Sequence, residues 1–435
     1  MTLEVPMIQR PNYLNKLIHK KENGKIKVIT GIRRCGKSYL LTNIYKDYLL
    51  SYGVDEPHII ILSLEDSESY PYRNPLELDK YLKEKLVDDK MHYIILDEIQ
   101  KVKSIKNPYL NDENEKIGFA DVLLSLMKKP NVDLYVTGSN SVMLSSDILT
   151  EFRGRGDEIR VFPLSFKEVY DSLEDKTKAW RLYSTYGGMP DVVLFDDHAE
   201  KQQYLKTLFN KVYLTDIQDR HNLRNDETVL SDLLSCISSA IGSLTNPAKL
   251  ANTFQSKEKV NVAPRTIARY LEIFENAYLI EEVQRYDIKG KNYIGSPLKY
   301  YFTDIGIRNA MLNFRQNEEN HIMENIIYNE LVMRGYSVDV GVVEYASKDE
   351  NKKVVKTNLE VDFIVNNGDE RYYIQSAFAI PDEEKRKQET FVYSRIPDSF
   401  KKIVIVKDDI EPWHDERGVY YIGLQEFLLN KDYLN

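Results

Sequence analysis

Apolar residues recur along the first third of the chain in two alternating patterns. Short continuous apolar runs predict buried strands, and stretches with apolar residues at helical spacing predict helices between them. The strands are expected at residues 27–30, 58–66, 93–96, 132–137 and 159–162. The helices are expected at residues 12–21, from 38 onward, at 75–88 and at 119–129, with a polar surface loop at 104–118. Because near-continuous apolar strands are typical of parallel sheets covered on both faces, this region is predicted to be an α/β layer structure.

The remainder of the chain shows a different order of elements. Residues 166–225 are predicted to be helical, a helix follows at 228–241, and another begins at Pro264. The alternating run from Leu279 to Tyr286 suits a strand. From residue 305, a helix, a hairpin with an Asn-Gly turn, a helix, a strand and a last helix predict a second α/β layer. Four domains are therefore expected, at residues 1–165, 166–225, 226–304 and 305–435.

Composition narrows the class of protein. The chain has 435 residues, of which 42% are hydrophobic, and no apolar run is long enough to cross a bilayer. The N-terminus lacks the basic-then-apolar pattern of a signal peptide. The two cysteines, Cys35 and Cys236, argue against a disulfide framework, so a cytoplasmic location is expected. The net charge of −9 argues against a protein that coats nucleic acid everywhere, but it leaves room for a local basic face.

A phosphate-binding loop stands between the first predicted strand and the helix after it. Gly31, Gly36, Lys37 and Ser38 fit the pattern Gly-x-x-x-x-Gly-Lys-Ser/Thr. The glycines let backbone N–H groups turn inward, and the helix N-terminus adds partial positive charge. Lys37 is expected to neutralise the phosphates of ATP and Ser38 to ligate Mg²⁺. The residues expected to contact the nucleotide here are Gly31, Ile32, Arg33, Arg34, Cys35, Gly36, Lys37, Ser38 and Tyr39.

Two carboxylates directly follow the strand at 93–96. Asp97 is expected to hold Mg²⁺ through water, and Glu98 to orient or deprotonate the water that attacks the γ-phosphate. Acid pairs at strand ends also occur in solvated turns. The phosphate loop about 60 residues upstream favours the nucleotide site over that alternative.

Two further positions complete the predicted catalytic set. Asn140, after the strand at 132–137, is expected to sense the γ-phosphate, with Ser139 as second choice and a simple turn as the alternative. Arg153 and Arg155 flank a glycine. Arg155 is expected either to act as an arginine finger on a neighbouring subunit's nucleotide or to lie in a solvated basic loop. The finger role predicts a homo-oligomer, such as a ring.

These motifs, taken in order, resemble those of the AAA+ ATPase superfamily. The resemblance rests on GIRRCGKS, IILDEIQ, VTGSNS, FRGRG and FPLSFKEV, with a later YGGMP. More narrowly, nearly the whole chain is similar to prokaryotic ATPases with a P-loop NTPase (AAA+) core, a helical lid, a winged helix and a C-terminal domain of unknown function. That last domain is related in pattern to restriction-type nucleases. The resemblance implies an α/β fold with the lid at 166–225, and it places Pro190, after Gly187 and Gly188, near the nucleotide.

The segment from 226 to 304 suits a helix-turn-helix with a wing. In the helix from Pro264, Ile267, Leu271 and Phe274 form one apolar face, while Arg265 and Arg269 point elsewhere. Residues 247–300 hold nine Lys or Arg and six Asp or Glu, which gives a net charge of +3. Contact of Arg265 and Arg269 with double-stranded DNA is one prediction, and a protein-contact module is the alternative.

The resemblance to nucleases can be followed to single positions in the last domain. The resembled fold requires a helix Glu, an Asp on the first hairpin strand, and Glu-x-Lys on the second, to hold divalent metal at a phosphodiester. Glu324 and Asp362 match, but Gln375 stands at the Glu position and Ala377 at the Lys position. Since Gln is a weaker ligand for a hard cation, a degenerate, non-cleaving domain used for recognition or assembly is predicted.

Three functions follow from these motifs. The first is an oligomeric, ATP-driven switch or remodeller that acts at DNA or a DNA-associated partner, with ATP and Mg²⁺ as cofactors. The second is a signalling ATPase that binds a protein partner and leaves DNA alone. The third is a metal-dependent nuclease gated by ATP. No membrane partner is expected.

Overall fold

The computed structural model divides the chain into two compact units. The first contains Met1–Pro163 and Asn276–Tyr278, and the second contains Leu164–Glu275 and Leu279–Asn435. The structure describes residues 8–110, 112, 114–138, 154–215, 217–218, 223, 227–257, 261–315, 318–348 and 354–434. Among these residues, no helix combines the length and apolar character that a bilayer crossing requires.

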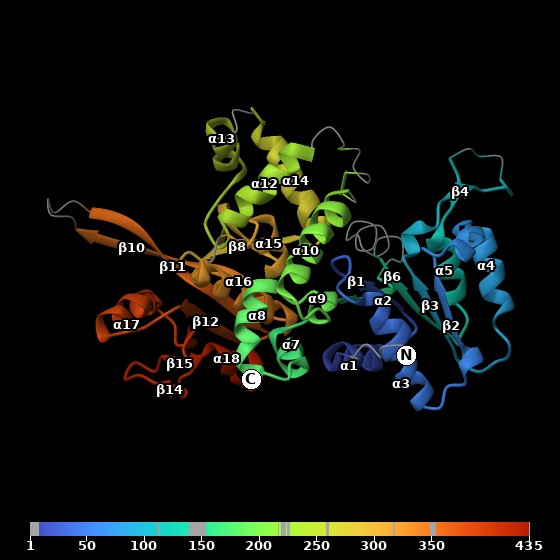
Figure 1. Cartoon of the computed structure of the whole chain (residues 1–435), viewed down its shortest axis with the longest axis horizontal. Helices are drawn as coiled ribbons and strands as arrows, with labels where there is room; N and C mark the ends of the chain where they lie inside the picture. Colours follow the sequence, from blue (N-terminus) through green and yellow to red (C-terminus); the bar gives the residue numbers. More distant parts are fainter. Residues whose placement is uncertain are drawn as a thin grey trace. The chain divides into compact units, whose positions relative to one another are not determined.

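The first unit is built on a five-stranded, wholly parallel sheet with the strand order β2-β3-β6-β1-β7 (Figure 1). The strands are β1 (Ile26–Thr30), β2 (Ile59–Ser63), β3 (His92–Asp97), β6 (Val132–Thr137) and β7 (Gly156–Arg160). All residues of β1, β3 and β6 are buried, as expected for central parallel strands. The predicted α/β class is therefore confirmed. The carboxyl ends of these strands place Thr30, Asp97 and Thr137 along one edge.

Helices connect the strands of this sheet. They are α1 (Pro11–Lys20), α2 (Lys37–Tyr39), η1 (Leu40–Tyr45), α3 (Lys46–Ser51), α4 (Pro75–Glu84) and α5 (Phe119–Met127), with single turns η2 (Glu56–His58), η3 (Ser67–Arg73) and η4 (Ile99–Lys101). Apolar faces of α4 and α5 pack on the sheet through Leu78, Leu82, Leu123 and Leu126. The segment from α2 to α3 is one continuous helical stretch whose middle, η1, is wound as a π-helix.

Three expected boundaries in this unit were wrong. The loop predicted at 104–118 contains a small antiparallel pair, β4 (Ile105–Lys106) and β5 (Lys116–Ile117), whose strands are too short to show periodicity. The helix predicted to reach residue 88 ends at Glu84. Strand β7 begins at Gly156 instead of Ile159, because its first residues pair with β1 from Ile26 onward despite their polarity.

The second unit begins with a helical region and three further helices. They are α7 (Phe166–Ser172), α8 (Ala179–Tyr186), α9 (Pro190–Val193), α10 (His198–Thr207), η7 (Leu208–Leu214), α12 (Glu227–Ser239), α13 (Pro247–Lys257) and α14 (Pro264–Asn276), with the turn η6 (Lys176–Lys178). As predicted, Ile267, Leu271 and Phe274 are buried on one face of α14, whereas Arg265 and Arg269 are exposed.

An eight-stranded mixed sheet organises the rest of this unit, in the order β14-β15-β13-β12-β11-β10-β8-β9. Its strands are β8 (Ile280–Asp287), β9 (Asn292–Phe302), β10 (Ser337–Lys348), β11 (Val354–Asn367), β12 (Glu370–Ala377), β13 (Lys401–Val406), β14 (Trp413–His414) and β15 (Tyr420–Gly423). The helical elements are α15 (Ile305–Met311), α16 (Glu319–Met333), α17 (Glu383–Thr390), α18 (Leu424–Leu429), η9 (Phe391–Arg395) and η10 (Asp432–Leu434). Strands β10 and β11 extend beyond their neighbours as a two-stranded ribbon, drawn orange in Figure 1.

Two features of this sheet differ from the sequence expectation. The run Leu279–Tyr286, predicted as a wing strand, lies in β8, which pairs with β9 and, in parallel register, with β10. Strands from both sides of the predicted boundary at 304/305 therefore belong to one sheet. In the β11–β12 hairpin, Asn367 pairs with Glu370, and the two-residue loop is therefore Gly368-Asp369 instead of Asn-Gly. Gly368 has a φ of +64°, which only glycine adopts at low cost.

Candidate functional site

Glycines fix the path of the loop between β1 and α2. Gly31 has a φ of +134°, and a Cβ added there would lie 2.0 Å from the carbonyl oxygen of Val161. Gly36 precedes α2 in the left-handed conformation, with a φ of 94°. A larger residue at position 31 would clash with the Val161 carbonyl. At positions 31 and 36 alike, the positive φ is unfavourable for a residue that has a Cβ.

The phosphate loop is in contact with a carboxylate at the end of β3, although Ser38 and Asp97 are 59 positions apart in the sequence. The Ser38 hydroxyl donates to the Asp97 carboxylate at 2.8 and 2.9 Å. The ammonium of Lys37, only 4% exposed, donates to the carbonyl oxygens of Gly31 and Ile32 at 2.9 and 3.0 Å. The side chains predicted to hold metal and phosphate thus lie in one site.

Thr137, the last residue of β6, connects the two acids and was not predicted to do so. Its hydroxyl donates to Asp97 and accepts the backbone N–H of Glu98 at 3.0 Å. One hydroxyl therefore orients the Asp97 carboxylate and fixes the backbone from which the Glu98 side chain starts. A threonine that ends a strand beside the acid strand was the only sequence signal for this role.

Glu98 occupies an unusual backbone conformation and a buried position. Its φ of 55° and ψ of 51° are left-handed, which is uncommon for residues other than glycine and is often associated with functional sites. The residue is 8% exposed, and its carboxylate accepts from the Gln100 amide. Burial raises the pKa of Glu98, and the nearby positive charge of Lys37 partly opposes that rise. The carboxylate is therefore a stronger base than an exposed glutamate.

Arg10 anchors the phosphate loop from outside the motif. Its guanidinium is 4% exposed and donates to the carbonyl oxygens of Cys35 at 3.0 Å and Phe162 at 2.9 Å. The Cys35 thiol donates to the carbonyl oxygen of Val161 at 3.2 Å. These bonds join the loop to the segment after β7, so the loop is supported by residues far from it in sequence. This role of Arg10 was not predicted, because backbone carbonyls occur at every residue and give the sequence no sign of an arginine's partner.

The donor set at Ser38 and Asp97 suits a hard divalent cation. A hydroxyl and a carboxylate, 2.8 Å apart, supply the oxygen ligands that Mg²⁺ takes beside substrate phosphates. A different group of possible metal ligands is formed by His58, Asp88 and His92. There, His92 uses both ring nitrogens within the chain, at 2.8 Å to the Lys90 carbonyl and 3.2 Å to the Val87 N–H, so we assign that group to the fold.

The other predicted site residues are distributed as follows. Asn140, Ser139 and Arg153 lie outside the described residues. Arg155 is exposed, and its carbonyl accepts the N–H of Ile26 at 3.0 Å.

The remaining residues predicted in the phosphate loop have different surroundings. Ile32 is buried, and Arg33 pairs with Glu65 at 3.0 Å. Arg34 has a φ of +68°, and Tyr39 is 39% exposed. Pro190 begins α9 in the second unit, so its predicted approach to the nucleotide stays a prediction.

The turn before Pro190 is held within the second unit by a buried acid. Asp304 is 3% exposed and accepts the N–H groups of Gly188 at 2.7 Å and Ile307 at 3.0 Å. Burial raises the pKa of Asp304 to about 6, against the opposing effect of these hydrogen bonds. The acid therefore joins the Gly-Gly turn to the start of α15.

The predicted nuclease positions also converge in the second unit. Glu324 on α16 and Asp362 on β11 are 7% and 8% exposed. The Gln375 side chain accepts the N–H of Asp362 at 3.4 Å, and Asp362 accepts the N–H of Ser376 at 2.8 Å. Burial and the neighbouring charge of Glu324 raise the pKa of Asp362 to about 8.

A lysine is present in this centre, although none stands at the expected position 377. Lys299 comes from β9 and donates to Glu324 at 2.7 Å. The resembled pattern places this lysine on β12, where Ala377 stands, whereas Lys299 comes from β9 and was not predicted.

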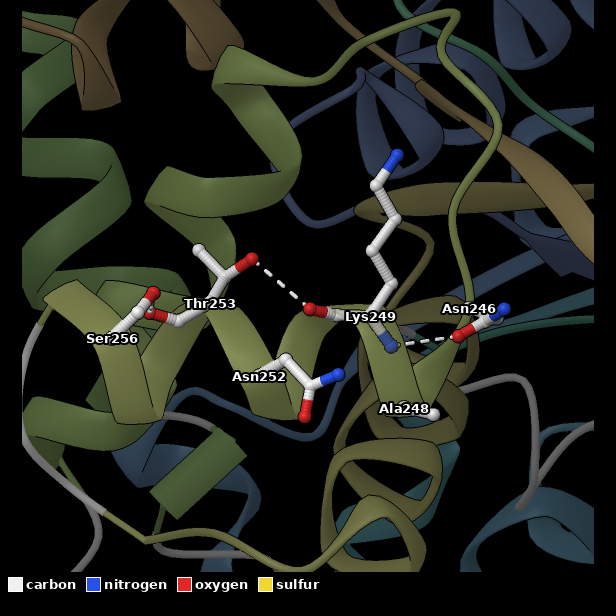
Figure 2. A pocket seen from close by; sticks show the side chains of 6 residues that line it. All are labelled: Asn246, Ala248, Lys249, Asn252, Thr253 and Ser256. Atoms are coloured by element: carbon white, nitrogen blue, oxygen red, sulfur yellow. Dashed lines mark hydrogen bonds between the residues drawn. The ribbon is translucent and has the colours of Figure 1, made fainter.

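A polar groove lies on α13. Six residues line it: Asn246, Ala248, Lys249, Asn252, Thr253 and Ser256 (Figure 2). Thr253 donates to the carbonyl of Lys249 at 3.0 Å, and the N–H of Lys249 donates to the Asn246 side chain at 2.7 Å. Amide, hydroxyl and ammonium groups can all contact a phosphate backbone.

Comparisons with known proteins agree with this geometry. Residues 23–170 match a family model described as "AAA domain", and residues 177–318 match a "Domain of unknown function (DUF8612)". An uncharacterized protein of Methanocaldococcus jannaschii, MJ1544, is 28% identical over 384 residues, which are 84% of this chain and 77% of that protein.

Two solved structures show limited likeness. The Aeropyrum pernix ORC1 protein in complex with DNA has a TM-score of 0.30 at 12% identity, over 70% of this chain and 92% of that one. Cdc6p from Pyrobaculum aerophilum has a TM-score of 0.29 at 11% identity, over 75% and 96%. With scores this low, nothing about function is drawn from either structure.

A bacterial relative covers almost the entire sequence. It is an uncharacterized protein of Haemophilus influenzae, 34% identical over 430 residues, which are 97% of this chain and 99% of the relative. The chain therefore belongs to the same family as this Haemophilus influenzae protein, and its residues 23–170 match an AAA domain.

Proposed function

We propose that the chain is an ATP-binding and ATP-hydrolysing switch or remodeller, which acts as a homo-oligomer at DNA or at a DNA-associated partner. The observation that carries the ATPase activity is the contact between Ser38 and Asp97 at 2.8 Å, which unites the phosphate loop and the acid strand. The AAA domain match over residues 23–170 supports the same reading.

The proposed reaction is in-line attack of water on the γ-phosphate of ATP. A bond forms from the water oxygen to the γ-phosphorus, the bond to the β-phosphate oxygen breaks, and ADP and inorganic phosphate are the products. Bound Mg²⁺, held by Ser38 and through water by Asp97, would supply positive charge beside the phosphate oxygens. Lys37 adds a second positive charge there. Glu98, a base strengthened by burial, orients the water and accepts its proton. Thr137 keeps both acids in place.

Replacement of the base tests this assignment. Glu98→Gln keeps the shape of the side chain and is expected to bind ATP normally, while turnover falls by about 10²–10⁴-fold. The exposed Glu68, changed to Gln, serves as the control in the same unit. Turnover within a factor of two of the native rate would exclude Glu98 as the base.

The finger role of Arg155 is proposed because the residue is exposed. Arg155→Ala and Lys37→Ala are each expected to be inactive alone, since one lacks the finger and the other the phosphate contact. Mixed together, they form interfaces in which an intact nucleotide site meets an intact Arg155, and ATPase activity returns. No recovery in the mixture, with oligomers seen by light scattering, would place Arg155 outside the neighbouring site.

DNA contact is proposed for the three-helix segment α12–α14. Arg265 and Arg269 are exposed on one face of α14, and the groove on α13 adds Lys249 with amide and hydroxyl groups (Figure 2). Arg265→Ala with Arg269→Ala is expected to weaken DNA binding and to lower its salt dependence by about two counterions. The control replaces Lys387 and Arg417, both exposed and outside this segment. Unchanged DNA binding would favour a protein partner.

A further inference from the structure

An arginine and a glutamate form an ion pair at the rim of the nucleotide site. Arg33 lies in the phosphate loop, and its guanidinium donates to the carboxylate of Glu65, which follows β2, at 3.0 Å. The ammonium of Lys101, in η4, approaches the same carboxylate oxygen at 3.8 Å. One acid therefore stands between two cations that come from different segments of the first unit.

The backbone of Glu65 is fixed at the carboxyl edge of the parallel sheet. Ser63, the last residue of β2, is in register with Asp97, and the N–H of Leu64 donates to the Asp97 carbonyl at 3.0 Å. The Arg73 guanidinium donates to the carbonyl oxygens of Leu64 at 2.9 Å and Glu65 at 3.1 Å. The Glu65 side chain thus starts from the edge of the sheet at which Asp97 lies.

The ion pair is close enough to the proposed base to act on its charge. Burial is the main cause of the raised pKa of Glu98. Besides the charges of Lys37 and Asp97, that of Glu65 raises this pKa and that of Arg33 lowers it. Because Glu98 is proposed to orient the water that attacks the γ-phosphate, Arg33 lies on the side of the site where that phosphate is expected.

The exposure of the three side chains allows Arg33 to change its partner. The side chains of Arg33, Glu65 and Lys101 are 32%, 44% and 41% exposed. Ion pairs on a protein surface contribute little to stability, so Arg33 can leave Glu65 at a small cost in free energy. A phosphate carries more charge than a carboxylate and binds a guanidinium in the same bidentate geometry, which makes it the stronger partner.

We propose that Arg33 is a catalytic residue that leaves Glu65 for the γ-phosphate when ATP binds, and that Lys101 then holds Glu65. Arg33 stays charged throughout, because a guanidinium does not lose its proton in a protein. Its N–H groups stabilise the charge on the γ-phosphate oxygens while the bond to the β-phosphate oxygen breaks. This inference rests on the proposed ATPase activity and adds to it an arginine from the chain's own phosphate loop.

Opposite effects on nucleotide affinity distinguish this exchange from a structural role. The probes are ADP and the β,γ-imido analogue of ATP, which is not hydrolysed, titrated with Mg²⁺ into the full chain by calorimetry. Arg33→Ala is expected to weaken binding of the analogue about 10–100-fold. Glu65→Gln is expected to tighten it about two- to fivefold, because the carboxylate no longer competes for Arg33. Binding of ADP, which has no γ-phosphate, should change less than about twofold in either variant.

A matched control and a double variant separate the exchange from a simple effect of charge. Asp66, the next residue after Glu65, is also an exposed acid, and Asp66→Asn should leave binding of the analogue unchanged. In the Arg33→Ala chain, Glu65→Gln should have no further effect, since the two residues act as a pair.

Turnover tests the catalytic part of the proposal. Arg33→Ala is expected to lower kcat about 10³-fold, the lower end of the range for an arginine at a transferring phosphoryl group. Arg33→Lys should recover only part of this rate, because lysine keeps the charge but lacks the planar fork. Arg33→Ala mixed with Lys37→Ala should stay inactive, because both changes damage the site of their own chain.

Failure of this inference can be told apart from failure of the proposed function. If the native chain neither binds nor hydrolyses ATP, both fail. If the native chain hydrolyses ATP and Arg33→Ala keeps more than half of its turnover, the inference alone fails. It is also overturned if Glu65→Gln tightens binding in the Arg33→Ala chain, if the mixture with Lys37→Ala recovers activity, or if Arg33→Ala loses ADP and the analogue equally.

Discussion

Two groups of side chains each combine a lysine with carboxylates, yet they hold the lysine differently. One is the nucleotide site of the first unit, and the other, here called the acidic centre, consists of Lys299, Glu324, Glu360 and Asp362 in the second unit. Lys37 donates to the carbonyls of Gly31 and Ile32, while Asp97 is engaged by the hydroxyls of Ser38 and Thr137. The hydrogen-bond partners of Lys37 and Asp97 named here are therefore uncharged groups. Neutral partners release a charge more easily than a carboxylate does, so this site can accept a charged ligand.

In the acidic centre, by contrast, the lysine is neutralised by the acids themselves. Lys299 contacts Glu324 and Glu360 directly, and its neighbour Tyr301 donates to Glu324. Charges that already satisfy one another gain little from an added ligand. The comparison teaches that the same residue types make a binding site or a structural centre according to which partners hold the lysine.

The largest effect is expected when each lysine is removed in turn. Lys299→Ala leaves buried acids unpaired, so the free energy of unfolding should fall by about 3–5 kcal/mol with ATP turnover per folded chain unchanged. Lys37→Ala loses bonds to neutral carbonyls, about 1–2 kcal/mol, but should abolish ATP turnover. Chemical denaturation and phosphate release measure the two. Equal losses of stability would remove the distinction between the centres.

The next largest effect is a pH dependence of the unfolding free energy, which is expected from the buried acid Asp304 of the second unit. Asp304, whose pKa is raised to about 6 from a usual 3.8, keeps its proton longer in the folded chain than in the unfolded one. Its contribution to stability is therefore full below pH 3.8 and is lost as the pH rises to 6. At 1.36 kcal/mol per unit, the total change is about 3 kcal/mol.

Asp304→Asn provides the control for that titration. The amide still accepts one hydrogen bond from the Gly188 turn but cannot ionise. The difference in unfolding free energy between the native chain and this variant should change between pH 4 and 6 and stay constant from pH 7 to 8. A constant difference over the whole range would show that Asp304 does not titrate in that window.

A smaller effect on stability tests whether the backbone of the phosphate loop is fixed at Gly31. Gly31→Ala introduces a Cβ against the Val161 carbonyl, whereas Gly24→Ala, at a φ of +72°, meets no atom within 4 Å. Both substitutions strain the backbone, so the steric clash alone should make Gly31→Ala about 1–3 kcal/mol worse in thermal or chemical unfolding. A similar cost at both positions would mean that the loop moves to accommodate the methyl group.

The smallest expected effect is a fall in kcat on loss of the Thr137 hydroxyl, which is an uncharged hydrogen-bond partner of Asp97. Thr137→Val preserves the shape but removes the bonds to Asp97 and to the Glu98 N–H, so kcat should fall about tenfold with little change in KM, equivalent to 1.4 kcal/mol. Thr137→Ser restores the hydroxyl and should recover most of the rate. Failure of the serine variant to recover would assign the loss to packing.

Much of the nucleotide site could be predicted because its signal is local in sequence. The spacing of Gly31, Gly36, Lys37 and Ser38, and the acids that end an apolar strand, follow from phosphate and metal chemistry. The buried runs likewise predicted the central strands. Short or polar strands such as β4, β5 and the start of β7 gave no periodic signal, since pairing with a neighbour and not their own composition makes them strands.

The supporting residues could not be predicted, for a common physical reason. Arg10 binds backbone carbonyls 25 and 152 positions away, and carbonyls exist at every residue. Thr137 acts through one hydroxyl with two partners. Lys299 reaches its acids from a strand that sequence analysis placed in another domain. In each case the role depends on which segments the fold brings together, and this information is spread over the whole chain.

The shared sheet of the second unit has a mechanical consequence. The β8–β9 hairpin is hydrogen-bonded to β10, which also forms the longest strand pair of this sheet with β11. The pairing between β8 and β10 is parallel and joins Arg285, Tyr286 and Asp287 to Val340, Gly341 and Val342. Because β8 follows α14 in the chain and pairs with β10, α14 is connected to the sheet by backbone hydrogen bonds as well as by side-chain packing. We therefore expect the β8–β9 hairpin and the β10–β11 ribbon to move as one piece, because backbone hydrogen bonds join both to β10.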